Sequence, residues 1–234
     1  MSSLIDSATA IMTSSARQLE LAGTNVANVS TPGFKQVHST RRLATMPTES
    51  FSSALEQTRA RLDQGKLIST GRPFDLAVMG SGYLAVRSGD SISYIRNGQF
   101  VRSKDGLLVS TQGGVLQRAN GGDLVVASQT PEILEDGVVM EDGHATGRAG
   151  VFEPASIDQA SSVDGAHFDL GSSPQASDTA GLRQGFLEAS NVDTGEQMVT
   201  MMAALRQTEA GAKLIQTYDE LLGKAFATLG QAGR

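Results

Sequence analysis

The chain has 234 residues, of which 39% are hydrophobic and 19% are charged, a length that suits one or two compact domains. Its formal net charge is −6 and its basic residues form no stripe, which argues against a nucleic-acid partner. Because cysteine is absent, disulfides, thiolate nucleophiles and zinc–thiolate sites are excluded.

The N-terminal segment predicts an amphipathic helix over residues 3–29. One row of residues recurs with alternating steps of three and four, the spacing of a helical seam. The row consists of Ile5, Ala8, Met12, Ser15, Leu19, Ala22, Val26 and Val29. Many surrounding residues are serine or threonine, which form helices weakly, so this helix should depend on packing against a partner. Pro32 and Gly33 end it, since proline cannot continue the hydrogen-bond ladder.

The middle of the chain changes to a β pattern after a predicted linker over 36–70, which contains a possible short helix over 51–62. Short apolar runs are separated by turns such as Asn97-Gly98 and Asp105-Gly106, which favour antiparallel hairpins. The predicted strands are 74–79, 83–87, 91–96, 99–102, 107–110, 115–118, 124–127, 138–141, 148–152 and one around 167–170.

The C-terminal segment predicts a second helix. Asp193 followed by Glu196 has the spacing of a capping box. The row with steps of three and four consists of Met198, Met201, Leu205, Thr208, Ala212, Ile215, Asp219, Leu222, Phe226 and Leu229. A second apolar row widens the stripe and consists of Met202, Leu214, Leu221 and Ala225. Such width suits a helix that contacts more than one neighbour.

The predicted fold class is therefore α+β, with terminal helices that pack as a coiled-coil-like core around an inserted all-β domain of short antiparallel strands. An ordinary amphipathic helix on a globular core explains either stripe alone, but two heptad-spaced stripes make mutual packing an equally good interpretation. The predicted domains are an N-terminal helix over 1–35, the linker over 36–70, the β-rich domain over 71–182 and the C-terminal helix over 183–234.

No catalytic constellation is found. His38, His144 and His167 are far apart and offer no close pair of metal ligands. The glycines around Ser81 lack both the lysine of a phosphate-binding loop and the five-residue frame of a nucleophile elbow. We therefore expect no enzyme activity, no metal and no cofactor.

Three stretches of sequence carry a resemblance to known proteins. Residues 22–35, A-G-T-N-V-A-N-V-S-T-P-G-F-K, follow the pattern N-N-(L/I)-A-N-x-x-T-x-G-(F/Y)-K except at Thr24. Residues 70–84 and 94–100 resemble T-G-x-P-x-D-L-A-(I/V)-x-G-x-G-F-F and Y-(T/S)-R-x-G-x-F, and Leu84 is one of the departures. Residues 185–193 read G-F-L-E-A-S-N-V-D and are followed by E-Q-M-V.

In this order the stretches resemble the axial rod and hook proteins of the bacterial flagellum. The resemblance implies a structural subunit of the basal-body rod that self-assembles through its terminal helices into the axial drive shaft. The β domain argues against the short rod proteins, and its modest size argues against the hook protein. Proximal and distal rod proteins both remain, and the short chain favours a proximal one.

The resemblance and the stripes together define an expected assembly interface. It consists of Ile5, Ala8, Met12, Leu19, Ala22, Asn25, Val26, Asn28, Val29, Gly33, Phe34, Asn191, Val192, Met198, Met201, Leu205, Ala212, Ile215, Leu222, Phe226 and Leu229. The expected partners are other rod subunits and the flagellar type III export apparatus, without nucleic acid, membrane insertion or a small-molecule substrate.

The expected location is the periplasmic rod, reached without a cleavable signal, because the N-terminus has neither a basic nor an apolar signal region. No apolar run reaches the length of a membrane span. A different class of function is an oligomeric β module that binds glycan or peptidoglycan. The absence of tryptophan and the presence of three tyrosines give that alternative little support.

Overall fold

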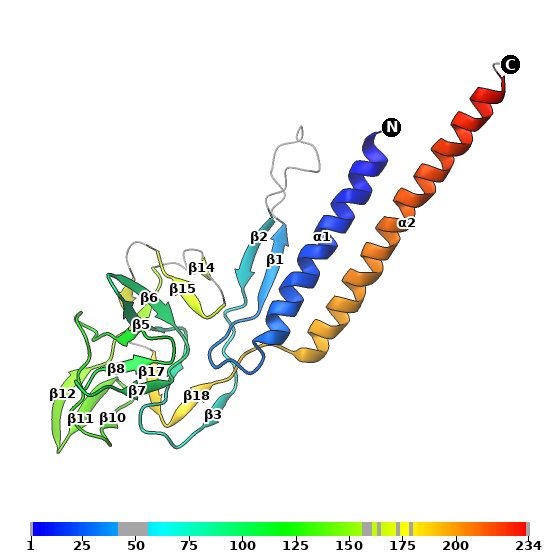
Figure 1. The fold of residues 1–234 in the computed structure, drawn as a ribbon. Helices are drawn as coiled ribbons and strands as arrows, with labels where there is room; N and C mark the ends of the chain where they lie inside the picture. The colour runs from blue at the N-terminus through cyan, green and yellow to red at the C-terminus, as the bar shows by residue number, and fades with distance from the viewer. Residues whose placement is uncertain are drawn as a thin grey trace. The chain divides into compact units, whose positions relative to one another are not determined.

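The computed structural model describes residues 2–41, 56–155, 161–162, 165–171, 174–177 and 180–232. Helix α1 spans Ser2–Ala27, helix α2 spans Thr194–Ala232, and the described chain between them is mostly β (Figure 1). The fold is therefore α+β, as predicted. The chain divides into a helical unit, drawn from Met1–Val26, His38–Thr58 and Asp193–Arg234, and a β unit, drawn from Ala27–Val37 and Arg59–Val192.

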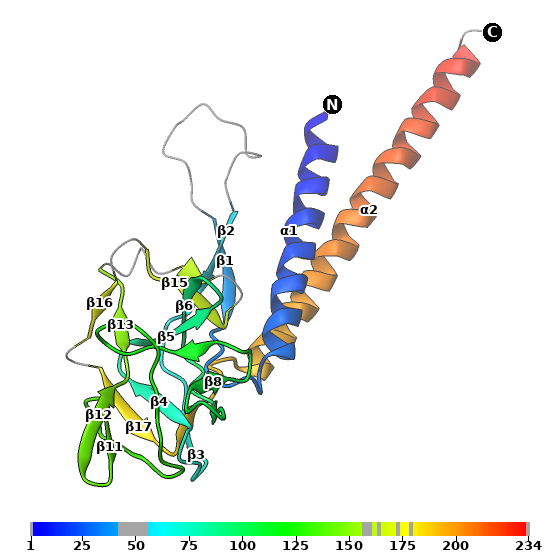
Figure 2. The same ribbon diagram turned by 60° about the vertical axis from the view of Figure 1, so that its left-hand side comes forward.

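The two helices of the helical unit run side by side in opposite directions (Figures 1 and 2). The Ser15 hydroxyl donates a hydrogen bond to Gln207 Oε1 at 3.2 Å. Further along α1, Asn25 Nδ2 donates to Gln197 Oε1 at 2.9 Å. The later residue of α1 therefore pairs with the earlier residue of α2, so the two helices are antiparallel.

The start of α2 is capped as the sequence predicts. The Asp193 carboxylate accepts a hydrogen bond from the Glu196 N–H at 3.1 Å, which satisfies one of the free donors of the first turn. The preceding residues, grouped in the prediction with this helix, form strands β17 and β18 instead. Their pairing with other strands supplies the backbone hydrogen bonds that a helix would otherwise supply.

Eighteen strands are assigned within the described residues. They are β1 Val37–Arg41, β2 Glu56–Ala60, β3 Leu67–Ser69, β4 Leu76–Met79, β5 Tyr83–Ser88, β6 Ser91–Ile95, β7 Phe100–Arg102, β8 Leu108–Ser110, β9 Val115–Leu116, β10 Glu132–Ile133, β11 Val138–Glu141, β12 His144–Arg148, β13 Val151–Glu153, β14 Ser161–Ser162, β15 His167–Asp169, β16 Gln175–Ala176, β17 Gly181–Gln184 and β18 Phe186–Glu188. Most are short, as the dense turn signals predict.

The largest sheet of the described chain has nine strands in the order β14-β15-β6-β5-β9-β8-β7, with β13 and β16 joined beside β5. A three-stranded sheet, β10-β11-β12, and the pairs β1-β2, β4-β17 and β3-β18 complete the β structure. In the last two pairs, Leu182 lies opposite Val78 and Leu187 lies opposite Ile68. Strands near the beginning and the end of the β unit therefore lie side by side.

One apolar core holds the β unit together. Its fully buried members come from strands and from the loop between β9 and β10, and they include Leu76, Leu84, Phe100, Leu108, Leu116, Leu124, Val126, Val139 and Leu182. A smaller cluster is formed by Tyr83, Phe168 and Leu170. Burying an aliphatic or aromatic side chain of this size contributes about 1.5–3 kcal/mol, so the β unit has a core of its own.

Several strand predictions are confirmed, for example at β5, β6 and β11. The hairpin predicted at Asp105-Gly106 is confirmed by the pairing of β7 with β8, but the one at Asn97-Gly98 is wrong, because β6 pairs with β5 and β15 and not with β7. The predicted strand over 124–127 is wrong, because Val125 makes only an isolated bridge with Leu107 while Leu124 and Val126 fill the core. The short helix over 51–62 is wrong where it can be judged, because 56–60 form β2, and 51–55 lie outside the described residues.

Gly98 of the R-x-G-x-F stretch provides a test of this packing. A Cβ at Gly98 would lie 1.6 Å from the carbonyl oxygen of Leu76, and the Leu76 N–H donates to the Gly98 carbonyl at 2.8 Å. We expect Gly98→Ala to lower the free energy of unfolding by about 3 kcal/mol or more, because backbone must move. Urea unfolding measures this loss.

Gly23 supplies the opposite control. It lies within α1, and a Cβ added there would have no neighbouring atom within 4 Å, so Gly23→Ala should stabilise the helix by about 0.5–1 kcal/mol. An unchanged urea midpoint for Gly98→Ala would contradict the packing described here.

Candidate functional site

The contact between α1 and α2 is made by small side chains at intervals of seven residues. On α1, Ala8, Ser15 and Ala22 are buried, and on α2, Ala204 and Gly211 are buried. A Cβ added to Gly211 would lie 2.7 Å from Met12 Cγ, so the two backbones approach closely. Small residues at heptad spacing permit such an approach, which larger side chains would prevent.

The predicted row on α1 lies on the covered side of the helix over most of its length. Three members are buried, and Met12, Leu19 and Val26 are half-buried. The row is exposed at its two ends, where Ile5 and Val29 lie. Asn25, another predicted residue, is buried and bonds to Gln197.

The predicted row on α2 is divided between two sides of the helix. Its half-buried members are Met201, Thr208, Ala212, Ile215 and Leu222. Met198, Leu205 and Phe226 are 54%, 48% and 70% exposed, and the Leu229 side chain lies outside the described side chains. The side of α2 that faces α1 contains Gln197 and Gly211. Neither residue is a large apolar one, so the apolar pattern does not include them.

Helix α2 consequently has an apolar surface that α1 leaves exposed. We call it the outer α2 face, and it consists of Met198, Val199, Met202, Leu205, Leu214, Leu221 and Phe226. A helix that is apolar on more than one side is normally buried by more than one neighbour. Exposed apolar groups of this extent are typical of surfaces that bind another protein chain.

Six predicted interface residues lie in the β unit: Asn28, Val29, Gly33, Phe34, Asn191 and Val192. Gly33 and Phe34 are buried there, and Asn191 and Val192 are half-buried. Gly33 has a φ of 70°, and a Cβ would lie 2.5 Å from backbone atoms of Arg96, so glycine is required. Asn28, by contrast, is a turn residue whose side chain accepts a hydrogen bond from the Thr31 hydroxyl.

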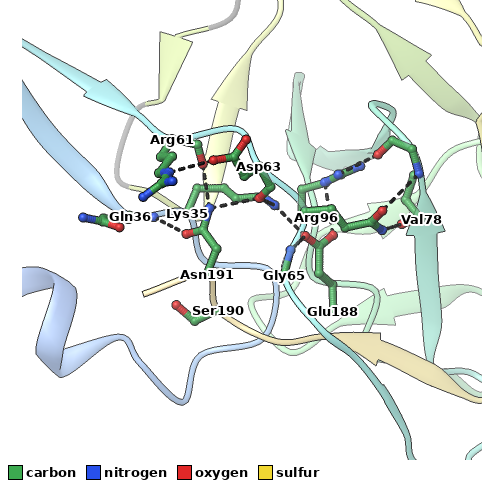
Figure 3. Close-up of polar contacts among 12 residues, drawn as sticks. Lys35, Gln36, Arg61, Asp63, Gly65, Val78, Arg96, Glu188, Ser190 and Asn191 are labelled. Atoms are coloured by element: carbon green, nitrogen blue, oxygen red, sulfur yellow. Dashed lines mark hydrogen bonds and ion pairs between the residues drawn. The ribbon is translucent and has the colours of Figure 1, made fainter. Parts of the chain in front are cut away.

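Three charged side chains meet in the interior of the β unit (Figure 3). Lys35, Arg96 and Glu188 have side-chain exposures of 1%, 2% and 0%. Lys35 Nζ lies 2.5 Å from Glu188 Oε1, and Arg96 Nε lies 3.2 Å from Glu188 Oε2. We call this group the buried triad. Each member belongs to a different one of the three stretches that carry the resemblance.

Backbone groups complete the surroundings of the triad. Lys35 Nζ also donates to the Asp63 carbonyl at 2.7 Å, and the Gly65 N–H donates to Glu188 Oε1 at 2.8 Å. The Arg96 guanidinium donates to the carbonyls of Gly80 and Gly82. Buried charges are tolerated when they are paired and hydrogen-bonded in this way.

Burial also shifts the proton affinities at this place. Desolvation lowers the pKa of the Lys35 ammonium, an effect that the nearby Glu188 carboxylate opposes and Arg96 reinforces. The Tyr83 ring centroid lies 5.4 Å from the Arg96 guanidinium carbon. Burial raises the pKa of the Tyr83 phenol, although Arg96 acts in the other direction.

Asn191 connects three segments of the β unit beside the triad (Figure 3). Its Oδ1 accepts the Gln36 N–H at 2.7 Å. Its Nδ2 donates to the carbonyls of Arg61 and Asp63 at 2.8 and 2.9 Å. The Asn191 side chain therefore uses its full carboxamide to hold the segments around residues 36 and 62 against its own.

The described residues offer no arrangement for catalysis that we recognise. Within them, no group of three or more His, Cys, Asp or Glu side chains could hold a metal ion. His144 Nδ1 lies 3.0 Å from the Asp142 carbonyl in a turn. No helix of the described chain is long and apolar enough to cross a membrane.

The neighbouring residues Ala203 and Ala204 test the contact between the helices. Ala204 is fully buried, whereas Ala203 is exposed. We expect Ala204→Leu to lower the free energy of unfolding of the helical unit by about 1–3 kcal/mol, because a larger side chain forces α1 and α2 apart. Thermal unfolding followed by far-ultraviolet circular dichroism measures it. Ala203→Leu should change the midpoint little, and equal losses in both variants would refute the assigned face.

Comparison with known proteins identifies related domains in both parts of the chain. Residues 183–228 match the family described as the C-terminal part of the flagellar basal body rod FlgEFG proteins. Residues 77–147 match the family described as the flagellar hook protein FlgE/F/G D1 domain. The first match contains Glu188, Asn191 and most of α2, and the second contains Arg96.

Complete relatives align over most of this chain. It is 27% identical over 228 residues to the flagellar basal-body rod protein FlgF of Caulobacter vibrioides, which covers 92% of this chain and 93% of the relative. It is 28% identical over 239 residues to FlgG of Bacillus subtilis, with coverages of 88% and 90%. It is 28% identical over 236 residues to FlgF of Escherichia coli, with coverages of 92% and 93%.

These relatives are structural rod proteins and not enzymes, in agreement with the prediction of a non-enzymatic chain. With both domain types of the FlgE/F/G proteins and similarity to rod proteins along most of its length, the chain is a relative of the flagellar basal-body rod proteins FlgF and FlgG.

Proposed function

We propose that the chain is a structural subunit of the bacterial flagellar basal-body rod and that it self-assembles through its terminal helices. The outer α2 face is the observation that carries the proposal. It leaves seven large apolar side chains exposed on a single helix. The names of the relatives supply the kind of assembly, a rod.

In this proposal, α1 and α2 form a coiled-coil-like core that completes itself with helices of neighbouring copies. Full burial of an exposed side chain contributes about 1.5–3 kcal/mol, so covering the exposed half of Met202 or Leu205 would contribute about 1 kcal/mol, and several such residues would act together in each contact. In this proposal the outer α2 face contacts a different surface of the neighbouring copy, so the contact is heterologous. Repetition of a heterologous contact that does not close into a ring builds a helical tube.

The proposal also includes two exposed residues of the expected interface, one near the start of α1 and one in the turn that follows it. Ile5 and Val29 are exposed although they belong to the stripe, so neighbouring copies would cover them. Serine and threonine weaken α1 as an isolated helix. Such a segment is able to pass through the flagellar type III export apparatus unfolded and to become ordered on assembly in the periplasmic rod.

The proximal rod is the position we propose, because the chain is short for this group. The FlgF relatives from two organisms align over 93% of their own lengths. A distal rod subunit is the alternative, since FlgG of Bacillus subtilis is equally similar. Cryo-electron tomography of basal bodies that carry a tagged chain distinguishes the two positions.

A glycan-binding module is a weaker alternative. Sugar rings stack on exposed aromatic side chains, whereas Tyr83, Phe34, Phe100 and Phe168 are buried in the β unit. Binding of purified chain to peptidoglycan sacculi tests this alternative directly.

Leu205 tests the assembly proposal. It is 48% exposed on the outer α2 face, so Leu205→Asp should change the free energy of unfolding by less than about 1 kcal/mol. The same variant should lose the ability to form tubes or ordered oligomers at high concentration, because a carboxylate would be buried between copies. Sedimentation and electron microscopy of the purified protein measure assembly, and swimming of a complemented deletion strain measures function.

Gln112→Asp is the matched control, because it adds the same charge at an exposed polar position of the turn between β8 and β9, outside the outer α2 face. It should retain assembly and swimming. Normal tubes and normal swimming with Leu205→Asp would show that the outer α2 face is not the assembly surface.

A further inference from the structure

The first and last segments of the β unit meet at one buried place. The Gly33 N–H donates to the Glu188 carbonyl at 2.7 Å, and the Asn191 N–H donates to the Phe34 carbonyl at 3.4 Å. The Ala189 N–H donates to the Lys66 carbonyl at 2.8 Å. Residues 33–37, 61–66 and 185–191 therefore form one hydrogen-bonded group, although they are far apart in the sequence.

The buried charges at this place do not form separate ion pairs, because the cations outnumber the carboxylates. The buried triad holds two cations, Lys35 and Arg96, but only one carboxylate, that of Glu188. The Asp63 side chain is 70% exposed and pairs with Arg61 instead. Glu188 is thus the common partner of both buried cations, and backbone carbonyls take up their other donors.

The order of these residues along the chain gives the triad a consequence for folding. Both cations precede Glu188, and strands β17 and β18, which pair with β4 and β3, also come from the end of the unit. A chain without residues 185–192 would have to bury two cations with no carboxylate between them. The desolvation of an unpaired buried ion is strongly unfavourable.

We propose that Lys35, Arg96, Glu188 and Asn191 form a clasp that closes the β unit only when residues 185–192 are in place. The β unit then cannot complete its fold from its N-terminal part alone, and its three clasp segments open and close together. Asn191 contributes the neutral part of the clasp, through three hydrogen bonds to two other segments.

Unequal effects of two substitutions distinguish a clasp centred on Glu188 from a simple ion pair. Glu188→Gln leaves two buried cations beside a neutral amide, so the folding equilibrium constant of the β unit should fall about a hundredfold or more. Lys35→Met keeps the aliphatic stem and leaves Arg96 and Glu188 as a balanced pair, so the fall should be about tenfold or less.

The measurement uses the full chain in a Tyr218→Phe background. Tyr83 and Tyr94 then report on the β unit by fluorescence during urea unfolding, since the chain has three tyrosines and no tryptophan. Asp63→Asn is the matched control, because it removes a carboxylate from the exposed pair with Arg61. It should change the constant by no more than about threefold. Equal losses for Glu188→Gln and Lys35→Met would overturn the proposal.

Hydrogen exchange followed by mass spectrometry tests whether the three segments open together. Asn191→Ala removes no charge and should speed exchange about tenfold or more in 33–37, 61–66 and 185–191, while β8 and β9 keep their protection. Because this variant retains the triad, it decides the matter even if Glu188→Gln does not fold. Acceleration confined to 185–191, or spread evenly over the β unit, would refute the clasp.

Discussion

Both units depend on contacts between segments from the N-terminal part of the chain and segments from its C-terminal part. In the helical unit, α1 and α2 are antiparallel, with Asn25 bonded to Gln197. In the β unit, β3 and β4 pair with β18 and β17. The chain thus enters and leaves the β unit at neighbouring places. An inserted β domain requires this arrangement.

Pairing between distant segments is entropically unfavourable until the contacts on both sides are present. The structure offsets this loss with interactions that are strong only when complete. Glu188 is stable in the interior only with its cations, and they are stable only with Glu188. An incomplete β unit is therefore penalised more than a surface ion pair, such as that of Arg61 with Asp63, would penalise it.

Much of the fold could be predicted from local sequence. The seam spacing located α1, the Asp193 cap located the start of α2, and the turns at Gly89-Asp90 and Asp105-Gly106 located the β5-β6 and β7-β8 hairpins. These features succeed because they depend on neighbours within a few residues. Strand β12 was missed because His-Ala-Thr-Gly-Arg has no apolar alternation, and its position comes from pairing with β11.

The remainder depends on three-dimensional contacts that no local pattern contains. Lys35, Arg96 and Glu188 each belong to a recognisable stretch, but their spacing along the chain does not indicate that they touch. The side of α2 that contacts α1 is hidden from local patterns for a related reason. Its contact with α1 uses Gln197 and Gly211, where a hydrogen bond and a close backbone approach replace hydrophobicity.

The residues of the outer α2 face and those of the clasp therefore form two groups with different physical roles. Those on the outer α2 face are exposed in a single chain, and in the proposed assembly they would gain stabilisation through burial against another copy. Those of the clasp are already buried and bonded within their own chain. Under the proposed assembly, a substitution in the first group would act on the free energy of association, and one in the second would act on the free energy of folding of the β unit. A β unit that does not fold would also reduce assembly, so only a measurement on the isolated chain separates the two effects.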